Sequence, residues 1–205
     1  MANDSVLLVE GQDDKHVITN LLFAHQLDTR FVIKDKDGID NLTGSLLIEL
    51  RASELKRIGI IVDADTALVE RWTSLRSVLK KAGYTDLPNT PLVPGIVVRQ
   101  GGRPTVGIWL MPNNCDDGMI EDFVALLVPP EDRLLPRAGA AVDAIPGEDR
   151  RFVEIHRAKA VIHTWLAWQS EPGVRMGAAV TRMYLEPQAP TALAFVAWLN
   201  QLLHE

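Results

Sequence analysis

The sequence predicts an α/β fold with a Rossmann-like, mainly parallel sheet, a β-hairpin and C-terminal helices. Short apolar runs alternate with segments of helical periodicity, and right-handed crossovers turn such an alternation into a parallel sheet. The central run, residues 58–62, is apolar and β-branched, as expected for a strand that is buried on both faces. Two later apolar runs are separated by Gly101-Gly102, which is typical of a hairpin turn.

Length and composition fit one globular unit. The chain has 205 residues, of which 47% are hydrophobic and 23% are charged. We expect an α/β core over residues 1–130 and a helical extension over residues 131–205 that packs on it. Cys115 is the only cysteine, which excludes an internal disulfide. Because there is also no apolar signal region and no membrane-spanning run, we expect a cytoplasmic protein.

The net charge of -6 argues against a broad nucleic-acid surface, because phosphate binding depends on clustered Lys and Arg. A small nucleic-acid site remains open, since some of the acids can serve as metal ligands.

The first strand is predicted over residues 6–9 and is followed by Glu10, a turn at Gly11 and a helix. Asp13 or Asp14 would stabilise the start of this helix through the helix dipole. The apolar stripe of the helix consists of Val17, Ile18, Leu21 and Leu22.

A second strand is predicted over residues 31–34, followed by a turn at Asp37-Gly38 and an amphipathic helix over residues 42–50. After the central strand, another helix should run from Thr66 to about Lys81. Its expected buried stripe consists of Leu68, Val69, Trp72, Leu75 and Leu79. Its basic residues are most simply a solvated face, with phosphate binding as the alternative; they are Arg71, Arg76, Lys80 and Lys81.

The hairpin strands are predicted over residues 96–99 and 106–111, and a short helix with Ile120, Phe123, Val124 and Leu127 inward follows them. Residues 134–149 show little periodicity and are expected to be an exposed connection. Two further helices are predicted over residues 151–168 and 192–203.

Acidic residues follow two of the predicted strands. Glu10 follows the first strand, and Asp63 and Asp65 follow the central one. Carboxyl ends of parallel strands share one sheet edge, so these side chains should converge, and in an extended chain Asp63 and Asp65 share a face. Carboxylates this close repel each other unless a cation or proton lies between them. The alternative for Asp65 alone is that it caps the next helix.

Two further residues belong to the candidate site. Glu121 lies in the first turn of a helix, where the helix dipole alone favours an acid, or it is a further metal ligand. Lys159 falls on an inward stripe of the predicted helix, where a lysine either extends to solvent or meets a carboxylate. The stripe is formed by Phe152, Ile155, Ile162 and Leu166.

The motifs Val9-Glu10-Gly11, Asp13-Asp14 and Val62-Asp63-Ala64-Asp65 resemble the Toprim domain of topoisomerases, bacterial primases and OLD-family nucleases. With residues 107–113 and 121–123 included, nearly the whole chain resembles small stand-alone bacterial Toprim-like proteins of unassigned function.

The resemblance implies a Rossmann-like sheet and Mg²⁺ or Mn²⁺ on the acidic cluster. It also implies phosphoryl transfer on DNA or RNA. Glu10 would be a metal ligand or the general acid/base, Asp14 would match a second metal-site acid of the OLD nucleases, and Lys159 would be the counterpart of their assisting lysine. Mg²⁺ prefers such hard oxygen ligands, and two ions suit phosphodiester hydrolysis.

A metal-dependent nuclease is therefore the expected function. No tyrosine lies in a topoisomerase-like context, and the zinc and polymerase modules of primases are missing. The ATPase domain of the OLD nucleases is missing too, so a partner subunit would be separate. One rival is a haloacid-dehalogenase-like phosphatase, which Asp63-Ala64-Asp65 imitates although Ala67 replaces its usual Thr or Val. The other is a non-catalytic module that binds a nucleotide or a partner through the acidic edge.

Overall fold

The computed structural model describes residues 4–27, 31–51 and 54–204, and within them the core is one five-stranded sheet. The strands lie in the order β2-β1-β3-β5-β4. Strands β1, β2, β3 and β5 are parallel, and β4 pairs antiparallel with β5 as a hairpin. Their bounds are β1 Ser5–Val9, β2 Val32–Asp35, β3 Arg57–Asp63, β4 Ile96–Val98 and β5 Thr105–Met111. The predicted Rossmann-like α/β fold is therefore confirmed.

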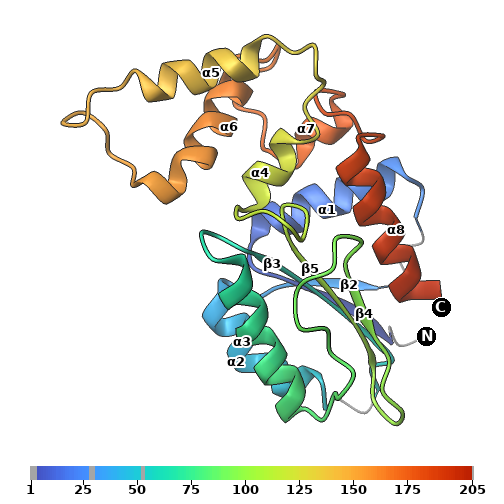
Figure 1. The fold of residues 1–205 in the computed structure, drawn as a ribbon. Helices are drawn as coiled ribbons and strands as arrows, with labels where there is room; N and C mark the ends of the chain where they lie inside the picture. Colours follow the sequence, from blue (N-terminus) through green and yellow to red (C-terminus); the bar gives the residue numbers. More distant parts are fainter. Residues whose placement is uncertain (1–3, 28–30, 52–53, 205) are drawn as a thin grey trace.

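Helices cover both faces of this sheet (Figure 1). They are α1 Gln12–Ala24, α2 Ile39–Glu49, α3 Leu68–Lys81, α4 Ile120–Ala125, α5 Leu134–Asp143, α6 Arg157–Ala167, α7 Ala178–Thr181 and α8 Pro190–His204, with a 3₁₀ turn η1 at Glu154–His156. Across residues 4–27, 31–51 and 54–204, none of the helices combines the length and apolar character needed to cross a membrane.

Helices α2 and α3 lie on one face of the sheet (Figure 1). Ile60 and Val62 of β3 belong to the same buried cluster as Trp72 of α3, and all three are fully buried. Val69 does not join this cluster. It is 58% exposed, so its place in the predicted stripe was wrong, because it lies next to the buried row and not in it.

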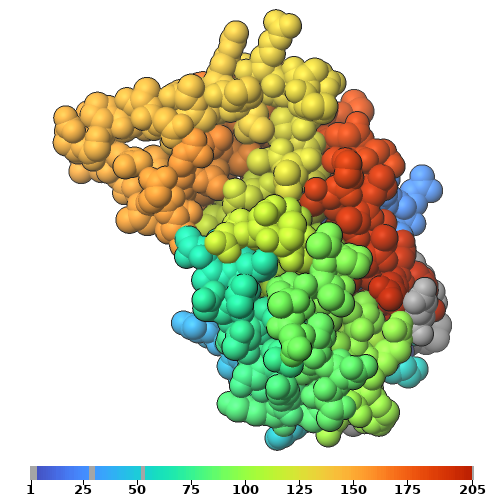
Figure 2. Space-filling view, viewed as in Figure 1, coloured from blue at the N-terminus to red at the C-terminus, as the bar shows by residue number. Residues whose placement is uncertain are grey.

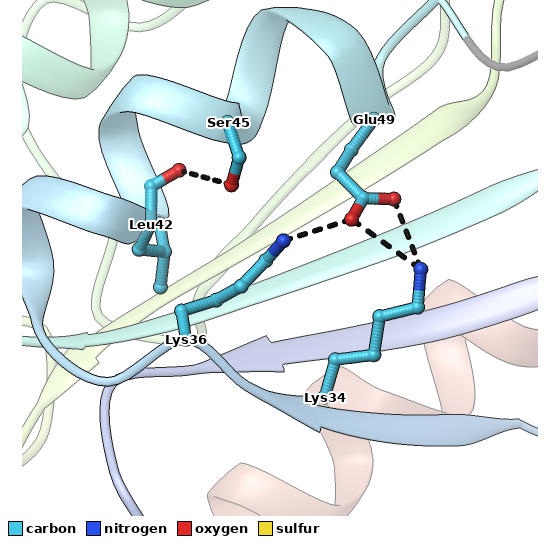
Figure 3. A network of polar contacts seen from close by, with 5 residues as sticks. All are labelled: Lys34, Lys36, Leu42, Ser45 and Glu49. Atoms are coloured by element: carbon cyan, nitrogen blue, oxygen red, sulfur yellow. Dashed lines mark hydrogen bonds and ion pairs between the residues drawn. The ribbon is translucent and has the colours of Figure 1, made fainter.

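A polar network ties α2 to the edge strand β2 (Figure 3). Glu49 of α2 pairs with Lys34 of β2 at 3.2 Å and with Lys36 at 2.8 Å. Lysines on an edge strand also discourage pairing with another chain.

Helix α8 covers the other face together with α1 and α4 (Figure 1). Gly59 of β3 and Gly107 of β5 lie opposite each other in register, and α8 packs across them. A Cβ on Gly107 would lie 2.8 Å from Leu202 and 3.0 Å from Trp198, both on α8. The two glycines therefore provide the flat surface on which α8 lies.

Helices α5 and α6, with η1, stand out from the body of the molecule (Figures 1 and 2). The prediction of an exposed connection over residues 134–149 was wrong, because its first ten residues form α5. Pro136 lies in the first turn, where a missing N–H costs nothing, and Asp132 accepts hydrogen bonds from the backbone N–H groups of Leu134 and Leu135 at 2.7 and 2.8 Å. These two hydrogen bonds stabilise the start of α5, although its apolar periodicity is weak.

The helix predicted over residues 151–168 begins later than expected. Its α-helical part is α6, preceded by the 3₁₀ turn η1. A 3₁₀ turn has about three residues per turn, which shifts the helical phase. Ile155 is consequently 38% exposed, and the predicted inward stripe is broken at that point.

Candidate functional site

The acidic ends of β1 and β3 meet at the carboxyl edge of the sheet. The two strands are direct neighbours, with Val9 in register with Ile61. Glu10 follows β1, and its Oε1 accepts a hydrogen bond from the backbone N–H of Asp63 at 2.8 Å. The parallel register thus brings together two acids that are 53 residues apart.

An open pocket of about 580 Å³ lies at this edge. All six residues that the sequence singles out line it, namely Glu10, Asp14, Asp63, Asp65, Glu121 and Lys159. They come from the turn after β1, from α1, from the end of β3 and the segment after it, and from α4 and α6. The structure therefore brings the whole candidate set into one pocket.

Asp14 and Asp63 each have one buried side-chain oxygen in the cluster. Asp14 is 4% exposed; its Oδ2 accepts a hydrogen bond from the Gly11 N–H at 3.2 Å. Oδ1 of Asp14 and Oδ1 of Asp63 are both buried without any hydrogen-bond partner. Burial and the charge of Glu10 raise the pKa of Asp14 to about 7. Burial, followed by the charges of Asp14 and Glu10, raises the pKa of Asp63 to about 9.

Asp65 lies beyond the strand and not on it. Strand β3 ends at Asp63, and Asp65 has a positive φ of 55°, so the predicted extended geometry does not reach it. Its N–H donates to the carbonyl of Gly118 at 2.8 Å, and its Oδ2 accepts from Arg71 Nη2 at 2.5 Å. The capping alternative for Asp65 was wrong: the N–H of Leu68, at the start of α3, donates to Asp117 Oδ1 at 2.8 Å.

Glu121 and Asp122, both in the first turn of α4, have different partners. Asp122 Oδ2 accepts a hydrogen bond from the Met119 N–H at 2.9 Å and so caps α4. Glu121 is 2% exposed and pairs with Lys159 Nζ at 3.4 Å. The prediction that Lys159 lies on an inward stripe was wrong, because its side chain is 51% exposed. The side chain extends from α6 over the pocket and meets a carboxylate there.

Arg71 belongs to the site although the sequence interpretation placed it on a solvated face. Its side chain is 19% exposed and holds Asp65. The sequence did contain an indication that Arg71 is partly buried. Arg71 lies three residues after Leu68 and four before Leu75, at the edge of the apolar stripe of α3. His156, at the end of η1, also lines the pocket and was not singled out.

The donor chemistry of the cluster fits a divalent cation. Among the described residues, no three His, Cys, Asp or Glu side chains are already close enough to share one metal ion. Burial first, and the neighbouring carboxylates after it, raise the pKa values of Asp14 and Asp63, as expected for acids that have no cation between them. Their two unpartnered oxygens are hard donors of the type that Mg²⁺ and Mn²⁺ prefer.

The fold and this pocket define an α/β protein with an acidic site at the carboxyl edge of a mainly parallel sheet. The chain belongs to the family described as "Protein of unknown function (DUF3226)", whose model matches residues 4–204. No curated protein and no solved structure matches the chain.

Proposed function

We propose that this chain is a Mg²⁺- or Mn²⁺-dependent phosphoryl-transfer enzyme acting on nucleic acid, a Toprim-type nuclease that hydrolyses phosphodiester bonds. The observation that carries the proposal is the pair of buried, unpartnered carboxylate oxygens of Asp14 and Asp63 beside Glu10. Burying such groups without compensation is costly, so a cation that binds there stabilises the folded protein. The Toprim resemblance of the same residues supports the choice of reaction.

The carboxylates that line the pocket would supply the ligands of one or two cations; they are Glu10, Asp14, Asp63, Asp65 and Glu121. When bound, the cation supplies charge neutralisation at the phosphate and promotes the attack of water. The chain itself has the other roles. Burial raises the pKa of Glu10, while the Asp63 N–H and the charge of Arg71 limit the rise. Glu10 is the candidate general acid/base of the site. Lys159 extends a cation over the pocket, where it would stabilise the charge that develops on the phosphate.

The proposal is tested with supercoiled plasmid and with single-stranded and duplex DNA and RNA. Mg²⁺ and Mn²⁺ should support cleavage, and Ca²⁺ should bind with little turnover because it accepts looser coordination. Glu10→Gln should abolish cleavage while the fold stays intact. Asp13→Asn is the matched control, because Asp13 lines the same pocket and has no role in the proposal. Failure to cut all of these substrates while metal is bound would overturn the nuclease assignment.

A second candidate is a non-catalytic module that binds a nucleotide or a partner. It is favoured by the two outer carboxylates, because Asp65 and Glu121 already have cationic partners in Arg71 and Lys159. This candidate predicts ligand binding that Glu10→Gln leaves intact and no cleavage by the wild type. A cytoplasmic location is part of the proposal under either candidate, and it rests on the sequence alone.

A further inference from the structure

The ion pair between Arg71 and Asp65 lies at the border of the acidic pocket. Arg71 Nη2 lies 2.5 Å from Asp65 Oδ2, and the two side chains are 19% and 33% exposed. Asp65 lines the pocket and also a smaller neighbouring pocket of about 240 Å³. The carboxylate that faces the candidate cation site is thus already neutralised by a cation from α3.

Both partners are held in place by the backbone. The hydrogen bond from the Asp65 N–H to the Gly118 carbonyl, at 2.8 Å, fixes the segment after β3. The Arg71 N–H donates to the Ala67 carbonyl at 2.9 Å in the first turns of α3. Arg71 Nε is nevertheless buried without a hydrogen-bond partner. The guanidinium therefore has an unused donor while its Nη2 is bound to Asp65.

We propose that Arg71 is an internal counter-ion that competes with the divalent cation for Asp65 and, once displaced, binds the phosphate of the substrate. This inference rests on the proposed function. Asp65 carries one negative charge, so a cation that binds it competes with Arg71 for the same electrostatic stabilisation. A guanidinium that is released beside the cation keeps its fork of N–H donors, which suits phosphate in two-point contacts. Arg71 is then a positioning residue in the metal-free protein and a substrate ligand in the loaded one.

If Arg71 is such a counter-ion, its removal should change two affinities in opposite directions: that for Mn²⁺ rises and that for a phosphate ligand falls. In Arg71→Gln the cation meets no competitor, so the Kd for Mn²⁺ should fall about fivefold, the effect typical of one partly exposed ion pair. The affinity for thymidine 3′,5′-bisphosphate, measured by calorimetry in saturating Ca²⁺, should fall at least fivefold. Damage to the fold weakens both kinds of binding, so it does not imitate this result.

Arg76→Gln is the matched control. Arg76 lies on the same helix and also has a buried Nε without a partner, but its Nη2 donates to the amide oxygen of Asn89 at 2.7 Å and not to a carboxylate. Arg76→Gln removes the same charge as Arg71→Gln but at a position that contacts no site carboxylate. It should therefore leave both affinities within about a factor of two of wild type, the additivity expected for distant sites.

A double-mutant cycle separates local competition from a general change in charge. In the Asp65→Asn background, Arg71→Gln should no longer raise Mn²⁺ affinity. A persistent rise there, or an unchanged or weaker Mn²⁺ affinity in Arg71→Gln alone, overturns the competition; unchanged bisphosphate affinity overturns the substrate role. Failure of the wild type to bind Mn²⁺ instead overturns the proposed function, on which the inference depends.

Discussion

Glu10 Oε1 accepts a hydrogen bond from the backbone N–H of Asp63 at 2.8 Å, which joins the ends of β1 and β3. The bond turns the Glu10 carboxylate toward β3 and places its charge beside Asp63, whose own Oδ1 has no partner. One local contact therefore both orders the acidic cluster and increases its internal repulsion.

The metal-free protein should lose stability as the pH rises from about 4 to about 9. The pKa of Asp14 is raised to about 7 and that of Asp63 to about 9, whereas both are near 4 in an unfolded chain. The folded state then binds more protons than the unfolded state within this window, so the unfolding free energy falls with increasing pH. Urea denaturation in chelator at pH 5, 7 and 9 measures this slope.

Asp63→Asn is the variant that checks the cause of this slope. It removes the most strongly shifted group and keeps the shape of the side chain. The variant should be more stable than wild type at pH 8 and should show a flatter pH dependence. Asp40→Asn, at an exposed position on α2, should leave the slope unchanged. Stability of the wild type that increases between pH 5 and 9 would contradict the account of the cluster.

Lys159→Met keeps the aliphatic stem and removes the charge. Turnover should fall by about 10²-fold if Lys159 stabilises the charge on the phosphate. The unfolding free energy should fall by about 1 kcal/mol, because the buried Glu121 loses its partner while the half-exposed lysine is partly screened by water. Kinetic assays and denaturation curves measure the two effects.

The double change Lys159→Met with Glu121→Gln separates these effects further. It should restore stability, because no buried charge is left without a partner, but it should not restore turnover. A Lys159→Met variant equal to wild type in both respects would show that Lys159 takes no part in the site.

Gly107→Ala should destabilise the fold by about 1–3 kcal/mol, the usual cost of overpacking a core. The new Cβ would lie 2.8 Å from Leu202 Cδ2, so α8 must shift away from the sheet. In a double-mutant cycle with Leu202→Ala, the two losses should add up to more than the loss in the double variant, because Leu202→Ala removes the clash. Gly101→Ala is the control, because no atom lies within 4 Å of its Cβ position. Thermal denaturation that fails to distinguish Gly107→Ala from Gly101→Ala would show that α8 does not need the flat surface.

The sheet and the convergence of acids could be predicted because both follow from local patterns. The apolar run before Asp63 and the position of Glu10 after a strand suffice to place both residues at one edge. Oδ1 of Asp132 accepts both hydrogen bonds that stabilise the start of α5, and such polar contacts lie outside the apolar periodicity on which the prediction was based.

The pairing of Arg71 with Asp65 could not be predicted from an extended chain. It depends on the left-handed backbone at Asp65 and on the hydrogen bond to Gly118, a residue 53 positions later. The position of the Lys159 side chain depends likewise on a distant partner, because it pairs with Glu121 of α4. Both are tertiary or backbone details that side-chain periodicity does not encode.

The most direct test of the metal site is calorimetric titration of Mn²⁺ into wild type and into the double variant Asp63→Asn with Asp65→Asn. We expect saturable binding to wild type and none to the double variant. The control, Asp40→Asn with Asp86→Asn, removes the same number of charges at exposed positions and should bind like wild type. Mn²⁺ affinity in the double variant equal to that of wild type would contradict the assignment of the cation to this edge of the sheet.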